Sequence, residues 1–143
     1  MNKLISVCAT LLVLILSQMV VACGPKQSTD PSSIAKGVFD SINAGKAEAA
    51  ASYFGQDAEF VCPWGQPTGV TMIESFFKTN LIPLKTHVDV QELKVEGTSL
   101  TGRFKINSVW LKNTFPKEVP LNFMVIGTIQ TGKITSMTWT AAK

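Results

Sequence analysis

The sequence predicts an α+β domain in which three helices come first and mainly antiparallel strands follow. Apolar residues recur at helical spacing between residues 34 and 42, which is typical of a helix with one buried face. Between residues 119 and 129 apolar and polar residues alternate instead, which is typical of a strand with one buried face. The chain has 143 residues and 45% of them are hydrophobic, so it can form one domain with a substantial core.

The first predicted helix begins after Asp30, because a carboxylate suits the N-cap position and Pro31 suits the first helical position. Asn43-Ala44-Gly45 ends this helix, since glycine readily adopts the left-handed conformation that closes a helix. A second helix, short and rich in alanine, is predicted over residues 46–54. We therefore expect two helices joined by a tight turn.

The next stretch predicts a short strand, a corner and a third helix. The strand covers residues 58–62 and ends at the Pro/Gly corner of residues 63–65. Thr71 and Glu74 form a T-x-x-E capping box, which predicts a helix start at Thr71. This helix should end near Asn80, because a proline follows three residues later.

Four strands are predicted over the second half of the chain, at residues 88–95, 100–110, 119–129 and 134–139. In the first of them the apolar residues change parity, which predicts a β-bulge near Gln91-Glu92. Tight turns are expected at Gly97-Thr98 and at Thr131-Gly132-Lys133. Glycines inside strands, Gly102 and Gly127, favour a strongly curved sheet.

Charged side chains are few and mixed in sign. The chain has thirteen Lys and Arg and ten Asp and Glu, which gives a formal net charge of +3 at pH 7. No basic stripe with interleaved aromatic residues is present, so nucleic-acid binding is not expected. There is no phosphate-binding loop or cofactor motif, and His87 has no second histidine or spaced acidic cluster beside it. We therefore expect neither a cofactor nor a bound metal.

Residues 1–22 are typical of a secretory signal peptide, with Lys3 followed by an apolar run. A membrane-spanning helix is the alternative for such a run. The end of the run favours the signal peptide, because Val20-Val21-Ala22-Cys23-Gly24 resembles a bacterial lipobox. That resemblance implies cleavage before Cys23, acylation of this residue with palmitate-like chains, and anchoring at the periplasmic face of the outer membrane.

Three segments follow from this interpretation: a signal peptide over residues 1–22, a lipidated cysteine and tether over 23–31, and a folded domain over 32–143. Cys8 lies in the signal peptide and Cys23 carries the lipid, so Cys62 stands alone in the folded domain. It has no partner for an internal disulfide, and the domain must be stabilised by its core.

The order of the elements resembles the nuclear transport factor 2-like superfamily, which includes SnoaL-like polyketide cyclases and ketosteroid isomerases. The resemblance rests on the stretches FDSINAGKAEAAASYFGQDAEF, PWGQPTGVTMIESFF and TGKITSMTW, which with the strands between them cover roughly residues 32–141. It implies a curved antiparallel sheet wrapped around the three N-terminal helices to form a cone. The open end of such a cone is an apolar pocket, which is a typical small-molecule site.

The resemblance does not include the catalytic groups of the ketosteroid isomerases. Their carboxylate base lies just before a proline at the end of the first strand, and that position is Cys62 here. Their tyrosine corresponds to Val38, and their second acid falls within residues 122–124, which include no acid. We therefore do not expect enolate chemistry of that kind.

Five polar residues are weak candidates for chemistry. Cys62 could be a nucleophile activated by His87, or simply a small buried residue at a strand end. Asp57, with Glu59 two residues later, could serve acid–base work, or the pair could be a turn residue and a solvated strand residue. Tyr53 completes this group of candidates.

The expected pocket is lined by apolar, aromatic and sulfur-containing side chains: Val38, Tyr53, Cys62, Trp64, Phe77, Trp110 and Phe123. Trp64 is the best candidate for the rim, because it lies in a Pro/Gly loop with little core to enter. Core packing explains Trp139 as well as a pocket does.

Two classes of function follow. The first is an envelope lipoprotein that binds a small apolar ligand or a protein partner without catalysis. The second is a SnoaL-like enzyme, an isomerase, cyclase or hydrolase, which would require at least two polar candidates to converge in one cavity. A homodimer through the outer face of the sheet is a further alternative, although Arg103 and Lys105 make that face polar.

Overall fold

The structure is a computed structural model and describes residues 30–108 and 122–142. The predicted signal peptide, Cys23 and Trp110 lie outside the described residues. The helices are α2 (Pro31–Asn43), α3 (Ala47–Ala51), α4 (Val70–Phe76) and the π-helix η1 (Phe77–Leu81). The strands are β1 (Phe54–Val61), β2 (His87–Glu96), β3 (Ser99–Asn107), β4 (Asn122–Gln130) and β5 (Lys133–Ala141).

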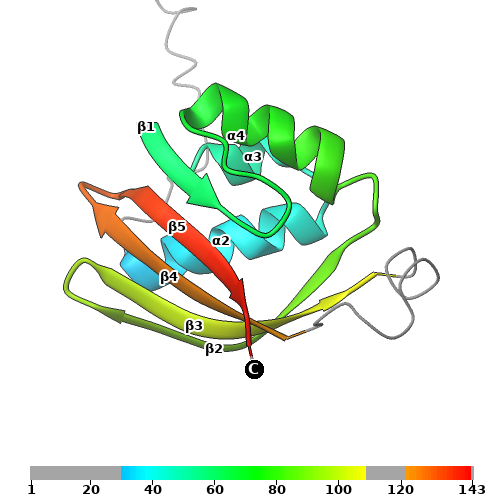
Figure 1. Cartoon of the computed structure of the whole chain (residues 1–143). Coiled ribbons are helices and arrows are strands. Elements are labelled where there is room, and N and C mark those ends of the chain that lie inside the picture. The colour runs from blue at the N-terminus through cyan, green and yellow to red at the C-terminus, as the bar shows by residue number, and fades with distance from the viewer. Residues whose placement is uncertain (1–29, 109–121, 143) are drawn as a thin grey trace, which may run out of the picture.

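The five strands form one curved, open sheet, and the helices lie against its concave side (Figure 1). The strand order is β1-β5-β4-β3-β2. All neighbouring strands are antiparallel except β1 and β5, which pair in parallel. The predicted α+β class with helices on the N-terminal side is thus confirmed, with the parallel edge strand as the one departure from an antiparallel sheet.

Helix α2 begins and ends as its local sequence predicts. One carboxylate oxygen of Asp30 accepts hydrogen bonds from the backbone N–H and the hydroxyl of Ser33, both at 2.9 Å. Pro31 occupies the first helical turn, where its missing N–H has no cost. After the helix, Gly45 takes the left-handed conformation at a φ of 70°. The buried face consists of Ile34, Ala35, Val38, Phe39 and Ile42.

Strand β1 begins at Phe54, earlier than the predicted start at residue 58, and α3 is correspondingly shorter than predicted. The reason is tertiary pairing. The backbone N–H of Ile134 donates to the carbonyl of Tyr53 at 2.9 Å, and Phe54 is in register with Ile134 of β5. A strand 80 residues away along the chain therefore turns the end of the predicted helix into extended backbone.

The capping box predicted at Thr71 and Glu74 is wrong. Gly69 occupies the N-cap position at a φ of 87°, and no side chain caps the helix. The N–H of Gly69 donates to the carbonyl of Ala58 at 2.8 Å, so pairing with β1 sets where the helix begins. The helix continues as η1 to Leu81, close to the predicted end, with a hydrogen bond of 3.0 Å from Ile82 N–H to the Phe77 carbonyl.

Two irregular positions of the sheet lie beside Gly102 and Gly127, the strand glycines that predict a curved sheet. The β2–β3 register shifts between Val90 and Glu92, and a Cβ atom on Gly102 would collide with the Glu92 carbonyl oxygen. The β4–β5 register shifts at Thr128, and a Cβ on Gly127 would lie 2.6 Å from the Ser136 carbonyl oxygen. Both bulges therefore require glycine on the neighbouring strand, because the backbones approach too closely for any side chain.

An aromatic cluster fills the space between the helices and the sheet. Trp139 of β5 lies at its centre, with ring centroids 4.8 Å from Phe104, 5.0 Å from Phe60 and 5.9 Å from Phe39. All four side chains are fully buried. Such ring pairs contribute about 0.5–1.5 kcal/mol each beyond the burial of their area, so this cluster is a major source of stability.

Candidate functional site

The turn after β1 forms the end of the fold at which the predicted site lies. Cys62 and Gly65 exchange two backbone hydrogen bonds, of 2.9 and 3.1 Å, which leaves Pro63 and Trp64 at the tip of a tight turn. The ring of Phe76, on α4, packs directly against Gly65, where a Cβ would lie 2.8 Å from the nearest ring carbon. Helix α4 thus fixes the position of the turn.

Trp64 is 39% exposed and packs against the ring of Phe123, with ring centroids 5.6 Å apart and an interplanar angle of 48°. Phe123 stacks on Phe104 at 5.4 Å with an interplanar angle of 13°, and Phe104 contacts Trp139. We call these four residues the aromatic column. The column connects an exposed indole at the surface to the centre of the core, and each ring supports the next.

Most of the residues predicted to line a pocket belong to the packed core. Val38, Phe77 and Phe123 are fully buried, Cys62 is buried in the same core cluster, and Tyr53 is half-buried with its ring against Gly37. Trp110 lies outside the described residues. The helix–sheet interior that they face is occupied by their own side chains together with the aromatic column.

Several hollows lined by described residues are open to the surface. One of about 560 Å³ lies beside α3 and η1, and one of about 360 Å³ lies between the end of α2 and His87. A third, of about 420 Å³, lies between Arg103 and Phe123. Of the predicted pocket residues, Phe123 alone lines any of these three hollows.

Cys62 is a poor nucleophile in this environment. Burial raises the pKa of its thiol, and the backbone N–H groups of Trp64 and Gly65 offset only part of that rise. His87 is exposed at the first position of β2, opposite Asn107, and among the described residues no hydrogen bond joins it to the thiol. The thiol is therefore protonated at neutral pH, and over residues 30–108 and 122–142 no hydrogen bond joins it to a side-chain base.

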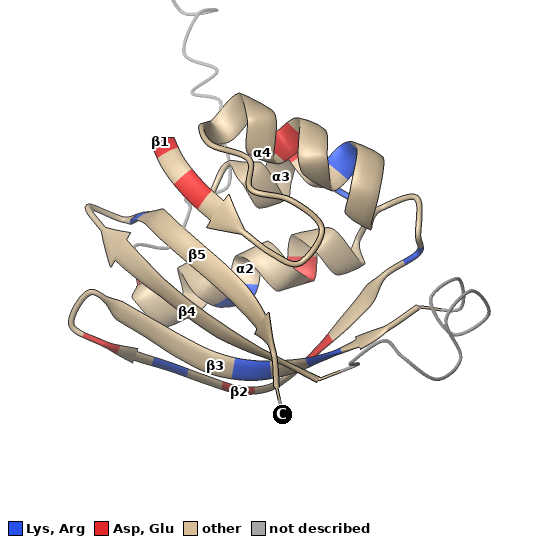
Figure 2. Ribbon diagram, in the orientation of Figure 1, with Lys and Arg blue, Asp and Glu red and all other residues tan. Residues whose placement is uncertain are grey.

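The acidic candidates do not form a site either. Asp57 and Glu59 are both exposed on β1, on the side opposite the buried Ala58 and Phe60. Over residues 30–108 and 122–142 there is no group of three His, Cys, Asp or Glu side chains that could hold a metal ion. Figure 2 shows that acidic residues of β2 lie beside the basic residues of β3.

Solved structures with the same arrangement are numerous. A nuclear transport factor 2-like protein of unknown function from Cytophaga hutchinsonii superposes with a TM-score of 0.63 at 16% identity, over 80% of this chain and 90% of its own. The chain has the nuclear transport factor 2-like fold. No protein-family model and no curated protein sequence matches it.

Two further proteins with the nuclear transport factor 2-like fold illustrate its range. A candidate polyketide cyclase from Sinorhizobium meliloti gives a TM-score of 0.64 at 20% identity, over 75% of this chain and 93% of its own. A hypothetical protein from Catenulispora acidiphila, described with a ketosteroid isomerase-like fold and in complex with trimethylamine, gives 0.62 at 15% identity, over 75% and 83%. At such identities the likeness concerns the fold alone, because this fold hosts unrelated functions.

Within the nuclear transport factor 2-like fold, the sequence did not reveal that Trp64 packs against Phe123. Phe104 stacks on Phe123 because the β3–β4 register places the two residues directly opposite each other. The alternation of apolar and polar residues predicts which face of each strand is buried. It does not predict the register between the two strands, because a shift by two residues keeps the same faces buried.

Proposed function

We propose that the protein is an envelope lipoprotein, anchored by lipid at Cys23, whose domain binds a small apolar ring-containing molecule without catalysis. The observation that carries the proposal is the exposed indole of Trp64, held on the aromatic column. An exposed aromatic ring with a rigid support offers one open face to a flat ligand and loses little side-chain entropy on binding.

The chemistry of the surrounding groups supports binding rather than catalysis. Burial raises the pKa of the Cys62 thiol, while His87 and Asp57 are exposed on different elements. A catalytic site needs a nucleophile or base within hydrogen-bond reach of its activating group. Proteins named as enzymes share the fold, which keeps a SnoaL-like isomerase, cyclase or hydrolase as the alternative.

The lipoprotein part rests on the sequence pattern at residues 20–24. None of the helices within residues 30–108 and 122–142 is long and apolar enough to cross a bilayer. The intact mass of the full chain from bacterial membranes should show loss of residues 1–22 and a lipid adduct on Cys23. A Cys23→Ser variant should lack the adduct and leave the membrane fraction.

Binding is tested with 8-anilinonaphthalene-1-sulfonate as the apolar probe and the full chain from the membrane fraction. We expect Trp64→Ala to weaken probe binding several-fold and Trp64→Phe to retain most of it. Met72→Ala is the matched control, because Met72 is also an exposed apolar residue but lies on α4 outside the column. Equal binding by Trp64→Ala and the parent protein would refute the site.

Native mass spectrometry of the same sample separates the alternatives. A small adduct that leaves on collisional activation supports the binder. A co-purifying polypeptide would indicate that the domain binds a protein partner rather than a small molecule. Conversion of an added ligand into a product of different mass would support the enzyme instead.

A further inference from the structure

The N-terminal end of α2 and the turn that carries Trp64 lie at opposite ends of the domain. The β2–β3 turn at Gly97 and the β4–β5 turn at Gly132 lie at the same end as the start of α2 (Figure 1). We call this the hairpin end. The Trp64 turn lies at the other end, where β1 and β5 finish and β4 begins.

The polar contacts of α2 establish this direction. The last residue of the helix, Asn43, is bonded to Val88 at the beginning of β2. Strand β2 then runs from there to its turn at Gly97, so the helix begins near the hairpin end. Strand β4 begins at Asn122, next to Phe123, which carries Trp64. The anchored end of the helix and the exposed indole are therefore separated by about the length of a strand.

The chain between the proposed lipid and the domain is short. Seven residues, 24–30, separate Cys23 from Pro31 of α2. Seven residues reach at most about 25 Å when fully extended, and a flexible chain of that length spans on average about 15 Å. A nine-residue strand such as β3 is about 30 Å long. An inverted domain would need to hold the start of α2 about 30 Å above the bilayer, which exceeds the reach of the tether.

We infer that the short tether holds the hairpin end against the bilayer that carries the anchor and directs Trp64 away from it. This inference rests on the proposed lipid at Cys23. The tips of the hairpin end are Gly97-Thr98 and Thr131-Gly132, which are small and polar. They suit the hydrated headgroup region and would not enter the acyl chains.

The orientation of the domain restricts where its ligand can come from. An aromatic ring that faces away from the bilayer meets molecules carried in the aqueous compartment. A lipid extracted directly from the anchoring membrane would need Trp64 to lie at the membrane surface. The ligand is therefore an apolar molecule that reaches Trp64 from the aqueous compartment.

The test uses full-length lipidated protein in vesicles of phosphatidylethanolamine and phosphatidylglycerol, with and without a lipid that carries a nitroxide quencher on its headgroup. In a Cys62→Ala background, Thr98→Cys and Gln66→Cys each receive the same fluorophore. The two sites are matched, because both are exposed loop positions, one in the hairpin end and one beside Trp64. We expect the quencher to reduce fluorescence several-fold more at residue 98 than at residue 66.

A second variant tests the cause. Insertion of 20 Gly and Ser residues after Lys26 should bring the two quenching ratios close together, because the tether then exceeds the length of the domain. Equal quenching in the parent protein, or stronger quenching at residue 66, overturns the inference, and so does a difference that the insertion leaves unchanged. The mass of the N-terminal peptide is measured on the same sample. An unmodified Cys23 refutes the proposed anchor and the orientation with it, whereas a lipidated Cys23 with equal quenching refutes the orientation alone.

Discussion

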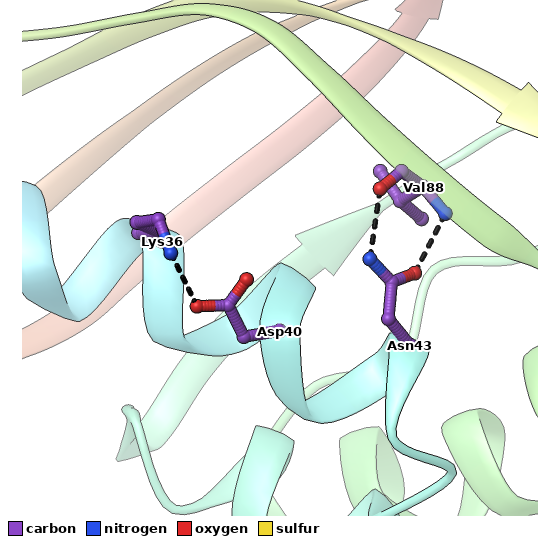
Figure 3. A network of polar contacts seen from close by, with 4 residues as sticks. All are labelled: Lys36, Asp40, Asn43 and Val88. Atoms are coloured by element: carbon purple, nitrogen blue, oxygen red, sulfur yellow. Dashed lines mark hydrogen bonds and ion pairs between the residues drawn. The ribbon is translucent and has the colours of Figure 1, made fainter.

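The side-chain amide of Asn43 pairs with both backbone groups of Val88, as a residue of a neighbouring strand would (Figure 3). Its Nδ2 donates to the Val88 carbonyl at 2.8 Å, and its Oδ1 accepts from the Val88 N–H at 2.7 Å. Val88 lies on β2, the last strand of the sheet, so without Asn43 these two groups have no strand partner. One amide thereby joins the end of α2 to the start of the sheet edge.

Replacement of Asn43 by alanine should lower the free energy of unfolding by about 1–3 kcal/mol, because it leaves a partly buried donor and acceptor unsatisfied. Urea unfolding of the full-length protein measures this change. Asn80→Ala is the control, since the Asn80 amide bonds only within an exposed helical turn and its loss should cost about 0.5 kcal/mol or less. Equal stability of Asn43→Ala and the parent protein would contradict the role of this pair.

Phe104→Ala should cost about 3–5 kcal/mol, because Phe104 is fully buried and supports both Phe123 and Trp139. The midpoint of urea unfolding should fall accordingly. Met72→Ala, an exposed apolar truncation on α4, should change stability by about 0.5 kcal/mol or less. A small effect of Phe104→Ala would mean that the column does not stabilise the domain.

The effect of Gly37→Ala on stability should change sign when the Tyr53 side chain is removed. A Cβ on Gly37 would collide with the Tyr53 ring, so Gly37→Ala should destabilise the parent protein. In a Tyr53→Ala background the collision is absent, and the same change should stabilise the helix by about 0.5–1 kcal/mol, because alanine is the better helix former. Thermal unfolding of the four proteins gives the coupling, and additive effects would exclude the contact.

Cys62 should make stability fall at alkaline pH. Its pKa in the folded protein is raised by burial above the ordinary value of 9.0, so above pH 9 the unfolded chain releases the thiol proton first. Deprotonation then favours unfolding, while below pH 8 the thiol contributes no pH dependence. The loss of stability between pH 8 and 10 should be smaller in Cys62→Ala than in the parent protein. Identical pH profiles would show that the thiol titrates normally.

Thiol labelling is a second test of the state of the Cys62 thiol. Iodoacetamide should modify Cys62 much more slowly than free cysteine at pH 8, because the folded protein supplies little thiolate and little access. The rate should rise to that of free cysteine when the domain is unfolded in urea. Rapid labelling of the folded protein would instead favour an activated nucleophile and the enzymatic alternative.

Part of the candidate site could be predicted from the sequence. The Pro/Gly corner indicated that Trp64 would lack a core to enter, and the structure leaves it partly exposed. The sequence could not predict whether the catalytic candidates come together in space. Whether Cys62 meets His87 depends on where two strand ends lie in space, and neither residue type nor spacing along the chain specifies that distance.

The sequence by itself determined the features that neighbouring residues control. Asp30 caps α2, Gly45 closes it, and the change of parity at residues 91–92 marks the bulge, because these signals act within a few residues of the backbone that they shape. The tertiary structure decided the rest. Pairing with β5 sets the start of β1, and the bond from Gly69 to Ala58 sets the start of α4. The contact of Trp64 with Phe123 likewise exists only after the sheet has brought distant segments together, since the free energy of such contacts depends on register and packing rather than on local pattern.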